Sequence, residues 1–552
     1  MKKITVKNIS SLEKVLPGTE MPCAAINKAS CLSGERFSYQ VAVIGFSEYT
    51  FSEYIDIQVE SDLPVKIYEV GYVPVVKPSY HNEYDNRYIT HQPAILPDII
   101  METDNVITIS GDKYGILWVS IDTAEKSGVH EIKIKFKNEG KFCGESIFKL
   151  EVISVSLPEQ KFIFTEWMHC DCISSYYGLS PLGEKHWEYI EKYMQMATEN
   201  GVNMMLTPIF TPPLDTKIGH ERPTVQLIDI SYNDGEYKFD FKNLLRWIDV
   251  CKRVNVTYLE IAHLFTQWGA MHAPKIEVWE DAKKIKKFGW ETDSESSEYL
   301  DFLNQLLPQL TEFLSKHWDK SRVYFHISDE PGIEHSERYG RLFSFVKERI
   351  EGFQLMDAIS DYEFYEKGFS ATPICTIKTI DKFIEHNAKN LWGYYCCGEG
   401  SGNLSNRFIA MPSYRNRIIG IQLYKYGIKG FLHWGYNFYY SQYSVKRINP
   451  FITNDAYGGF PAGDSFSVYP GVDGPIPSIR LFVFFEALQD MRALQLLETL
   501  IGRRNVVKII DELAGTDMTF TDYPCGVEFI HNLREKVNET IKKSAYSDVV
   551  KF

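Results

Sequence analysis

The sequence predicts an α/β protein in which an N-terminal β-sandwich precedes a (β/α)8 barrel of the TIM type. Before about residue 155, short β-branched runs recur with no long amphipathic helix between them, a pattern typical of a β-sandwich. After residue 160, apolar β runs alternate with helical segments, which indicates a parallel sheet. A chain of 552 residues that is 44% hydrophobic is long enough for several domains with a large core.

The N-terminal strands are expected where β-branched runs lie between clusters of glycine, asparagine, aspartate and proline. These runs are Phe37–Ile44, Tyr54–Val59, Val65–Tyr68, Gly115–Ile121, Gly128–Phe136 and Phe148–Ile153. The segment Leu157–Lys161 contains a proline and is interpreted as the linker that leaves the sandwich. We therefore assign residues 1–157 to the N-terminal domain.

The barrel strands are expected in the apolar runs of the second part of the chain. They are Phe162–Met168, Asn203–Phe210, Thr257–Leu264, Val323–Ile327, Gln354–Ile359, Thr372–Ile377, Asn390–Tyr395 and Gly430–Trp434. Helices are expected near residues 184–199, 241–253, 296–317, 336–350, 362–368, 378–388, 409–426 and 477–500. Alternating strands and helices of this number match a (β/α)8 barrel with insertions, which we place at residues 158–504. Two further helical stretches, 505–514 and 526–544, predict a C-terminal extension, residues 505–552, packed on the barrel.

Charge and hydropathy exclude some classes of partner. The net charge of −14 argues against nucleic acid, because phosphate contacts need clustered lysine and arginine. No apolar run reaches the ~18 residues that a membrane helix requires, so no membrane partner is expected. The N-terminal segment 1–8 is charged but no apolar region follows it, so we expect no secretory signal and a cytoplasmic location. The sequence leaves a homo-oligomer open.

The ten cysteines are not spaced as a disulfide framework or a zinc site. Cys170 and Cys172 form a C-x-C pair and Cys396 and Cys397 are adjacent, but neither pair has a second Cys/His pair at zinc spacing. We expect reduced thiols, no metal and no cofactor. Tyrosine and tryptophan are abundant, and flat rings suit stacking on the apolar face of a sugar.

The most informative motif is the adjacent pair Asp329 and Glu330, which follows the predicted strand Val323–Ile327 and precedes Pro331. Neighbouring side chains inside a strand point to opposite faces, but both acids can face one pocket where a proline ends the strand. Like charges held together push their pKa values apart, as an acid/base pair requires. An exposed turn that caps the next helix is the alternative interpretation.

Further candidate residues gather at the carboxyl ends of the predicted strands, where barrel enzymes place their active sites. The candidates for binding substrate are Trp167, His169, Trp268, Tyr394, Tyr395, Trp434, Asn437 and Asp464. Successive side chains alternate in direction, so only one of Tyr394 and Tyr395 can face the pocket. Trp434 is a candidate wall for a sugar ring or else a plain rim aromatic, and Asp464 beside Gly463 is a candidate for sugar hydroxyls or else ordinary turn chemistry. His326 is interpreted as an interior histidine whose ring nitrogens are satisfied.

Four segments of the chain carry a resemblance to a known family. They are Val323–Pro331, Leu391–Cys396, Gly430–Asn437 and Gly463–Gly471, the last followed by Pro477–Arg480 and Glu486–Asp490. In this order and spacing the chain resembles glycoside hydrolase family 123 and the wider group that shares its catalytic domain. The resemblance implies a β-N-acetylgalactosaminidase that removes terminal β-linked GalNAc from a glycan with retention, by substrate-assisted catalysis.

The resemblance also implies roles for the two acids. Asp329 would orient and stabilise the 2-acetamido group while its oxygen attacks the anomeric carbon and forms an oxazolinium intermediate. Glu330 would protonate the leaving oxygen and then activate water. A carboxylate near the acetamide nitrogen opposes the positive charge that develops there, which agrees with this assignment. The sequence leaves GalNAc and GlcNAc specificity undecided, because the choice depends on one epimeric hydroxyl.

Two alternative functions stay open. In the first, a retaining glycosidase of other specificity uses Glu330 as acid/base and Glu399 as nucleophile, with carboxyl groups ~5 Å apart. Glu399 lies in a glycine-rich segment that we expect to be too flexible for a nucleophile. In the second, the protein binds glycans without cleaving them, but binding alone does not require two adjacent carboxylates.

Overall fold

The computed structural model describes residues 4–17, 24–45, 53–80, 85–109, 114–124 and 126–549, with backbone alone at Glu53 and at 546–549. Residues 1–3 of the segment considered for a signal, and residues 550–552 of the predicted C-terminal extension, lie outside the described residues. Within the described ranges, every helix is too short or too polar to cross a membrane.

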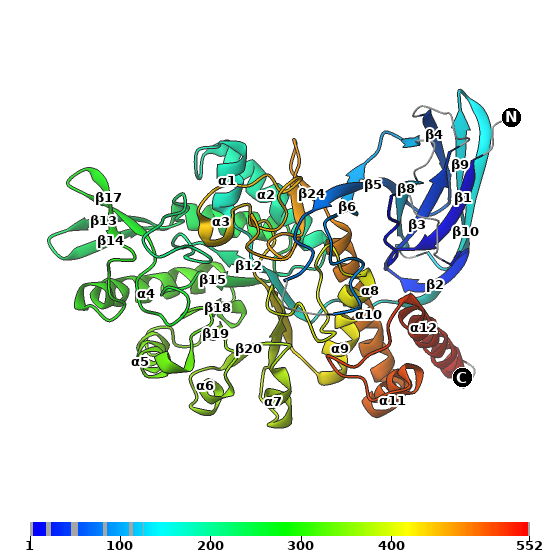
Figure 1. Ribbon diagram of the computed structural model, residues 1–552. Coiled ribbons are helices and arrows are strands. Elements are labelled where there is room, and N and C mark those ends of the chain that lie inside the picture. Colours follow the sequence, from blue (N-terminus) through cyan, green and yellow to red (C-terminus); the bar gives the residue numbers. More distant parts are fainter. Residues whose placement is uncertain are drawn as a thin grey trace.

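Eight parallel strands close into a barrel, as the alternation of β and helical segments predicts (Figure 1). In barrel order they are β11 (Ile163–Glu166), β12 (Met204–Thr207), β15 (Tyr258–Ile261), β18 (Val323–Phe325), β19 (Gln354–Ala358), β20 (Thr372–Thr376), β21 (Trp392–Tyr394) and β22 (Gly430–His433). The barrel closes because β22 pairs with β11. Each strand lies within the run expected for it, and the TIM-type barrel is confirmed.

The helices follow the expected order around the barrel, except that the first of them was not expected from the sequence. They are α1 (Cys170–Tyr177), α2 (Glu184–Glu199), α3 (Lys242–Arg253), α4 (Ser297–His317), α5 (Ser336–Lys347), α6 (Tyr362–Glu366), α7 (Ile380–Glu385), α8 (Ser413–Arg417), α9 (Ile419–Tyr426) and α10 (Ile479–Ile501). The helix expected at 409–426 is instead two shorter helices that begin after Pro412. At Gly420 a side chain would clash, since a Cβ there would lie 2.1 Å from the carbonyl oxygen of Ala487 in α10.

The N-terminal region is rich in β-structure and contains all six expected strands. One five-stranded sheet runs in the order β1 (Thr5–Ser10), β3 (Arg36–Ile44), β8 (Tyr114–Asp122), β5 (Val65–Val75) and β6 (Ala94–Glu102). The other runs β2 (Lys28–Ser33), β10 (Lys141–Ser156), β9 (Gly128–Asn138), β4 (Glu53–Glu60) and β7 (Val106–Ile109). The rings of Tyr39 and Phe148, one from each sheet, stack with centroids 4.2 Å apart, so the two sheets share an apolar core.

A four-stranded sheet interrupts the barrel and was not expected from the sequence. Its order is β14 (Glu236–Asp240), β13 (Asp229–Asn233), β16 (Ile276–Glu280) and β17 (Lys283–Phe288). Figure 1 shows this sheet at the end of the molecule opposite the N-terminal region. Its strands were missed because they carry many charges, as in the lysine-rich β17, and do not resemble buried barrel strands.

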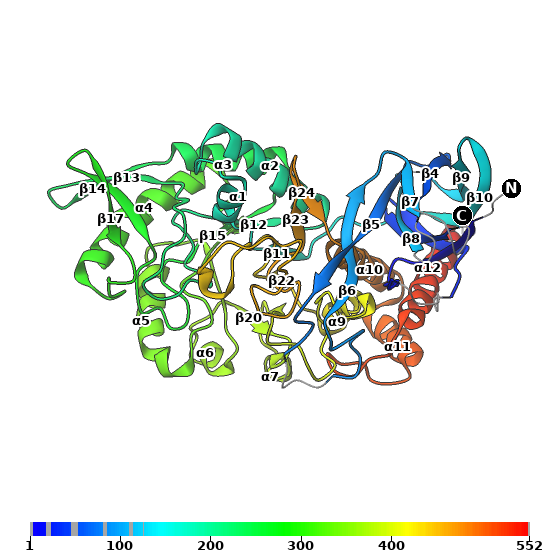
Figure 2. The same ribbon diagram turned by 45° about the horizontal axis from the view of Figure 1, so that its top comes forward.

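Contacts between distant parts of the chain join the N-terminal region to the barrel. Asp98 in β6 accepts a hydrogen bond from Arg480 Nε in α10 (2.9 Å) and another from the Tyr469 hydroxyl in β23 (Val468–Pro470; 2.6 Å). Strand β23 pairs with β24 (Pro475–Pro477). Figure 2 shows β5 and β6 extending from the N-terminal sheets toward the barrel. One part of this joint is thus an ion pair, buried on both sides, with an added tyrosine.

The last two helices are α11 (Arg503–Ala514) and α12 (Val527–Val549), and both were expected. Helix α12 contacts α10 and also the N-terminal sheet at β2 and β10 (Figure 1). Asn538 Nδ2 donates to the carbonyl oxygen of Ser30 in β2 (3.0 Å), and Lys542 forms an ion pair with Glu151 in β10. The C-terminal helix therefore bridges the barrel helices and the N-terminal region. The predicted domain boundaries stay a prediction.

Candidate active site

Asp329 and Glu330 lie in a tight turn at the carboxyl end of β18. The turn is fixed on one side by the backbone N–H of Trp268, which donates to the carbonyl oxygen of Asp329 (2.7 Å). Glu330 has a φ of 45°, a left-handed conformation that costs energy for a residue with a side chain and often marks functional sites. The Asp329 side chain is half-buried and the Glu330 side chain is exposed. Both acids therefore lie at the barrel mouth, as predicted.

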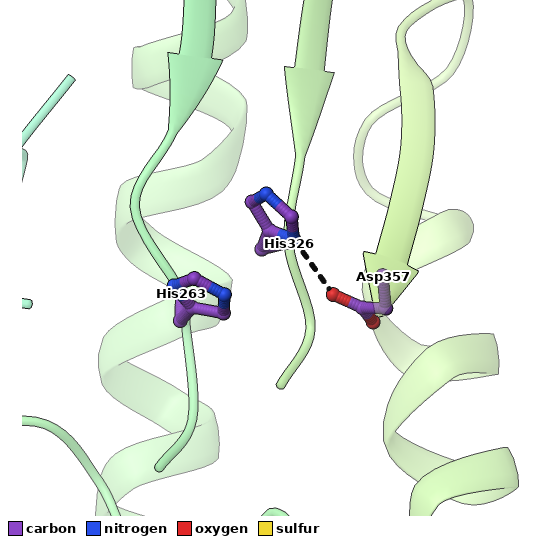
Figure 3. A group of neighbouring side chains, drawn as sticks. All are labelled: His263, His326 and Asp357. Carbon is purple, nitrogen blue, oxygen red and sulfur yellow. Dashed lines mark hydrogen bonds and ion pairs between the residues drawn. The ribbon is translucent and has the colours of Figure 1, made fainter. Parts of the chain in front are cut away.

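A buried charged network lies beneath this turn. His326 donates from Nε2 to Glu260 Oε1 (2.6 Å) and from Nδ1 to Asp357 Oδ1 (2.9 Å). Figure 3 shows the bond to Asp357. Burial lowers the pKa of His326, but the hydrogen bonds to Asp357 and Glu260 outweigh burial and raise that pKa to about 10. An imidazolium clamped between two carboxylates thus lies three residues before Asp329, and the interior histidine with satisfied nitrogens is confirmed.

Asp357 also explains why β18 is shorter than expected. Its carboxylate accepts hydrogen bonds from the backbone N–H groups of Ile327 (3.0 Å) and Ser328 (3.3 Å). These donors are therefore bonded to a side chain instead of continuing the strand ladder, and the strand stops at Phe325. The hydroxyl of Tyr339 in α5 donates to the same carboxylate (2.5 Å). The backbone that leads into the acid pair is thus held by buried hydrogen bonds.

The environment of Asp329 raises the pKa of its carboxyl group well above its usual value of 3.8. Burial is the largest cause, and the neighbouring charge of Glu330 adds to it. The positive charge of His326 acts in the opposite direction. The two adjacent acids therefore differ in environment, one half-buried above a cation and the other open to solvent, which is the arrangement needed for two different chemical roles.

The structure separates the two neighbouring tyrosines. Tyr394 at the end of β21 donates its hydroxyl to Glu330 Oε1 (2.5 Å) and lies 3.1 Å from the hydroxyl of Ser360. Tyr395 is buried and donates instead to Asn416 Oδ1 in α8 (3.1 Å). Tyr394 is therefore the one that faces the acid pair, and the hydroxyl of Tyr395 serves the packing of a helix against the barrel.

Trp434 lies at the end of β22 with its indole held by a buried acid. Its Nε1 donates to Asp464 Oδ2 (3.0 Å), and its ring packs edge-on against Phe438 and Phe460 with centroids 5.0 and 5.2 Å away. Burial raises the pKa of Asp464 to about 7, although the Trp434 hydrogen bond opposes the rise. Asp464 thus positions Trp434, and a ring that stays partly exposed is available as a wall.

Three other predicted site residues lie in the interior. Trp167 is only 2% exposed and donates from Nε1 to Glu260 Oε1 (2.6 Å). The backbone N–H of His169 donates to Asn437 Oδ1 (2.7 Å), and Asn437 Nδ2 donates back to the carbonyl oxygen of His169 (3.2 Å). These contacts join the barrel interior and two strand-end loops. Direct contact of Trp167, His169 and Asn437 with substrate stays a prediction. Trp268, by contrast, is 42% exposed.

Glu399 is held more firmly than its glycine-rich segment suggested. The side chain is 3% exposed, accepts a hydrogen bond from Thr376 Oγ1 and accepts another from the backbone N–H of Cys396 (2.8 Å). Burial, above all, raises the pKa of Glu399, and the charge of Glu330 also contributes. The expectation of a loosely held carboxylate is wrong, because Glu399 is buried and its carboxylate accepts hydrogen bonds from two donors.

One group within the described ranges brings metal-ligating atoms together: His263, His326 and Asp357, with ligand atoms within 4.8 Å of one another (Figure 3). The ring of His263 stacks on that of His326 with centroids 4.2 Å apart and 20° between the planes. Both nitrogens of His326 already donate to carboxylates, so it has no free lone pair for a metal. His326 and Asp357 therefore fit a charged hydrogen-bond network, with His263 stacked on it, and not a metal centre.

Sequence reasoning missed Glu260 and Asp357, the two acids of this network. Each is a carboxylate inside a run that was expected to be a buried strand, Thr257–Leu264 and Gln354–Ile359. A charged residue is rarely buried unless it is paired. An isolated acid in an apolar barrel strand was therefore a usable signal, although only the structure could identify His326 as the partner of both.

Comparison with known proteins gives a match to a family model in sequence and matches to solved structures. The family model of the glycoside hydrolase 123 catalytic domain matches residues 167–497. A family 123 glycoside hydrolase from Clostridium perfringens, studied for glycolipid glycan hydrolysis, has a TM-score of 0.74 at 15% identity and covers 100% of this chain and 99% of that chain. A family 39 glycoside hydrolase from Bacteroides cellulosilyticus WH2 has a TM-score of only 0.34 at 9% identity, covering 86% and 83% of the two chains. A search of curated proteins found no match.

Proposed function

The chain belongs to glycoside hydrolase family 123, and from this premise we propose that it is a retaining exo-β-N-acetylgalactosaminidase that cleaves terminal β-linked GalNAc. Membership of the family makes the protein a glycosidase that acts on glycans. The observation that carries the finer proposal is the Asp329–Glu330 pair at the mouth of the barrel, with one acid half-buried and the other exposed. Adjacent carboxylates in unlike environments suit a reaction in which the substrate supplies its own nucleophile.

In the proposed first step, the 2-acetamido oxygen forms a bond to the anomeric carbon as the bond to the leaving oxygen breaks. Glu330, in its protonated form, gives its proton to the leaving oxygen. Burial and the charge of Glu330 raise the pKa of Asp329, but in this step Glu330 is protonated, so that like charge is absent and the cation of His326 favours the Asp329 carboxylate. The acetamide nitrogen gains positive character, and the Asp329 carboxylate accepts its N–H and opposes that charge. The product of this step is an oxazolinium ion and a free alcohol.

In the second step, Glu330 as a carboxylate takes a proton from water while the water oxygen bonds to the anomeric carbon. The bond from that carbon to the acetamido oxygen breaks, the acetamide is restored, and Glu330 is again protonated. Two displacements at the same carbon give net retention. Water attacks from the face that the leaving group has vacated, so Glu330 can serve as the acid in the first step and as the base in the second.

The surrounding residues support these roles. The Tyr394 hydroxyl bonded to Glu330 Oε1 (2.5 Å) holds an otherwise exposed acid in one orientation. The buried His326 network fixes the backbone before Asp329 through Asp357. We propose that Trp434, fixed by Asp464, forms the wall against which the reacting sugar packs. The preference for GalNAc over GlcNAc rests on the family resemblance.

A second candidate mechanism has one observation in its favour. Glu399 is buried and held by two hydrogen bonds, so it has the rigidity that a nucleophile needs. In that mechanism a covalent ester to Glu399 would replace the oxazolinium ion. We prefer the adjacent pair because both Glu399 oxygens already accept hydrogen bonds within their own loop and strand.

The function is tested with a panel of nitrophenyl β-glycosides that carry a 2-acetamido or a 2-hydroxy group, in the galacto and gluco series. We expect turnover confined to the 2-acetamido sugars, fastest for GalNAc, and competitive inhibition by a GalNAc-thiazoline that mimics the cyclised intermediate. Turnover of 2-hydroxy sugars without thiazoline inhibition would favour Glu399. Binding without turnover of any glycoside would favour a glycan-binding protein.

Two further proposals concern the fold of the N-terminal domain and the location of the protein. We propose that the two N-terminal sheets form a β-sandwich, supported by their shared apolar core. We also propose a cytoplasmic location, supported by four free and buried cysteines of the barrel, Cys170, Cys172, Cys251 and Cys375.

A further inference from the structure

Two exposed aromatic side chains lie together at the barrel mouth. Trp268, in the loop after β15, is 42% exposed, and Tyr443, in the loop after β22, is 41% exposed. Their ring centroids are 6.2 Å apart and their planes cross at 85°. We call them the rim pair. Large aromatic rings are usually buried for most of their area, so two that are adjacent, exposed and near an active site need an explanation.

The backbone of the rim pair is fixed by a third loop, the one after β12. Asp215 in that loop accepts a hydrogen bond from the backbone N–H of Tyr443 (2.9 Å). The backbone N–H of Asp215 in turn donates to Gln267 Oε1 (2.7 Å), beside Trp268. Three loops from separate barrel strands are thus tied together at this point.

The same residues share an uncommon backbone conformation. Asp215, Trp268 and Tyr443 have φ values of 41°, 59° and 61°. Non-glycine residues rarely adopt positive φ, and they are enriched at ligand-binding positions where the surrounding structure enforces it. The loops therefore hold the two rings in defined positions instead of leaving them free on the surface.

The rim pair is connected directly to the catalytic turn. The backbone N–H of Trp268 is the donor to the carbonyl oxygen of Asp329 (2.7 Å). In the proposed function, the reacting sugar lies at the acids and against Trp434, inside the mouth. What remains of the substrate, beyond the bond that Glu330 protonates, must extend outward over the rim, where exposed rings can meet it.

We propose that the rim pair is the binding platform for the leaving group of the reaction, and that it takes a sugar ring, the second residue of the glycan chain. This inference rests on the proposed function of the Asp329–Glu330 site. A pyranose has an apolar face of C–H groups that packs flat on an indole. A second ring standing perpendicular to the first closes one side of the platform, which favours a compact ring over an extended chain.

The test compares Trp268→Asn and Tyr443→Asn with wild type. Asparagine is chosen because it tolerates the left-handed backbone at both positions. Trp279→Asn is the matched control, since Trp279 is equally exposed (41%) but lies in β16 of the inserted sheet. Each protein is assayed for kcat/KM on a β-linked GalNAc–galactose disaccharide and on octyl β-GalNAc, and for inhibition by free GalNAc.

We expect each rim variant to lose about 10-fold in kcat/KM on the disaccharide, the size of one aromatic stacking contact with its buried area. The inhibition constant of free GalNAc should stay within about twofold, because that sugar does not reach the rim, and the control should match wild type. Disaccharide activity unchanged in both rim variants would overturn the proposal. A loss confined to the octyl glycoside would replace the sugar ring with an aliphatic leaving group, and an equal loss in GalNAc inhibition would place the pair at the reacting sugar.

Failure of the proposed function gives a different result. If wild type cleaves no 2-acetamido disaccharide, the β-N-acetylgalactosaminidase assignment is wrong. The rim variants are then compared on the β-linked disaccharide that wild type does cleave, with its own monosaccharide as inhibitor. A selective loss on that disaccharide would still support the platform, and equal activity would still overturn it.

Discussion

Replacing Asp329 with asparagine should slow cyclisation and leave binding nearly unchanged. The substitution is almost isosteric, and the backbone at this position is held by Trp268 and, through Ile327 and Ser328, by Asp357. Asparagine can still accept the acetamide N–H through its carbonyl oxygen. What it cannot supply is the negative charge opposite the nitrogen that becomes positive in the transition state.

The size of the loss follows from that missing charge. Two unit charges about 4 Å apart interact by ~4 kcal/mol at an effective dielectric constant of about 20, a value suited to a half-buried site. The nitrogen carries only part of a charge in the transition state, so about 3–4 kcal/mol is an upper range, equivalent to roughly 10²–10³-fold in kcat. Substrate affinity should change much less, since the charge is absent from the ground state.

The assay is kcat and KM on a series of aryl 2-acetamido glycosides with increasingly good leaving groups. Because the loss arises in forming the oxazolinium ion, an activated leaving group should not rescue Asp329→Asn. Asp361→Asn is the matched control, because it makes the same change at an exposed rim acid whose side chain caps no helix. Near wild-type turnover by Asp329→Asn on 2-acetamido substrates would refute the substrate-assisted mechanism.

Four other perturbations test separate parts of the site and fold. Glu330→Gln should lose ~10²–10⁴-fold on poor leaving groups and far less on activated aryl glycosides, and equal losses on both would count against its acid role. Tyr394→Phe removes the hydrogen bond to Glu330 (2.5 Å) and should lower kcat/KM by about 10–100-fold, whereas Tyr395→Phe should cost mainly melting temperature; the reverse ranking would contradict the assignment. The pKa of His326 is raised from 6.5 to about 10, so the contribution of its charge to stability is complete below pH 6.5 and is lost as pH rises to 10. The melting temperature of wild type should therefore fall across that range more steeply than the melting temperature of His326→Gln. Parallel curves would show that the imidazolium contributes little. Removal of residues 1–157 should give an insoluble barrel, because Phe482 of α10 would lose its contact with Trp118 and Arg480 its contact with Asp98; a soluble, active truncation would contradict this.

The barrel could be predicted because each of its strands is a short apolar run followed by a helix. The run Gly430–Trp434, for example, is uniformly apolar up to His433 and matches β22 closely. Strand β6 was not expected, because Pro97 and Asp98 interrupt its apolar sequence. In the structure a register shift against β5 accommodates this break, and Asp98 finds its partner in Arg480. That partner is nearly 400 residues away, so local sequence could not reveal it.

The position of the acid pair was predictable for a similar local reason, since the apolar run Val323–Ile327 leads into Asp329 and Glu330 and a proline follows them. The roles of the supporting residues were not. Tyr394 and Tyr395 are the same residue type, and only the structure shows that Tyr394 reaches Glu330 while Tyr395 bonds to Asn416. Trp167 and His169 were expected at the rim because they follow a strand, but their hydrogen bonds place them inside. Depth along the barrel axis depends on where each ladder ends, which a single sequence does not encode locally.

The position of α12 has a consequence for how the chain reaches its native state during synthesis. Strand β2 emerges from the ribosome early, whereas Asn538 and Glu535, which bond to Ser30 in that strand, are made about 500 residues later. Contacts of such sequence separation form slowly, because a long loop must close first. We expect the N-terminal sheets to hold a protease-sensitive edge at β2 until the final helix docks. Completion of the last helix, and not closure of the barrel, would then be the step that locks both halves of the molecule together.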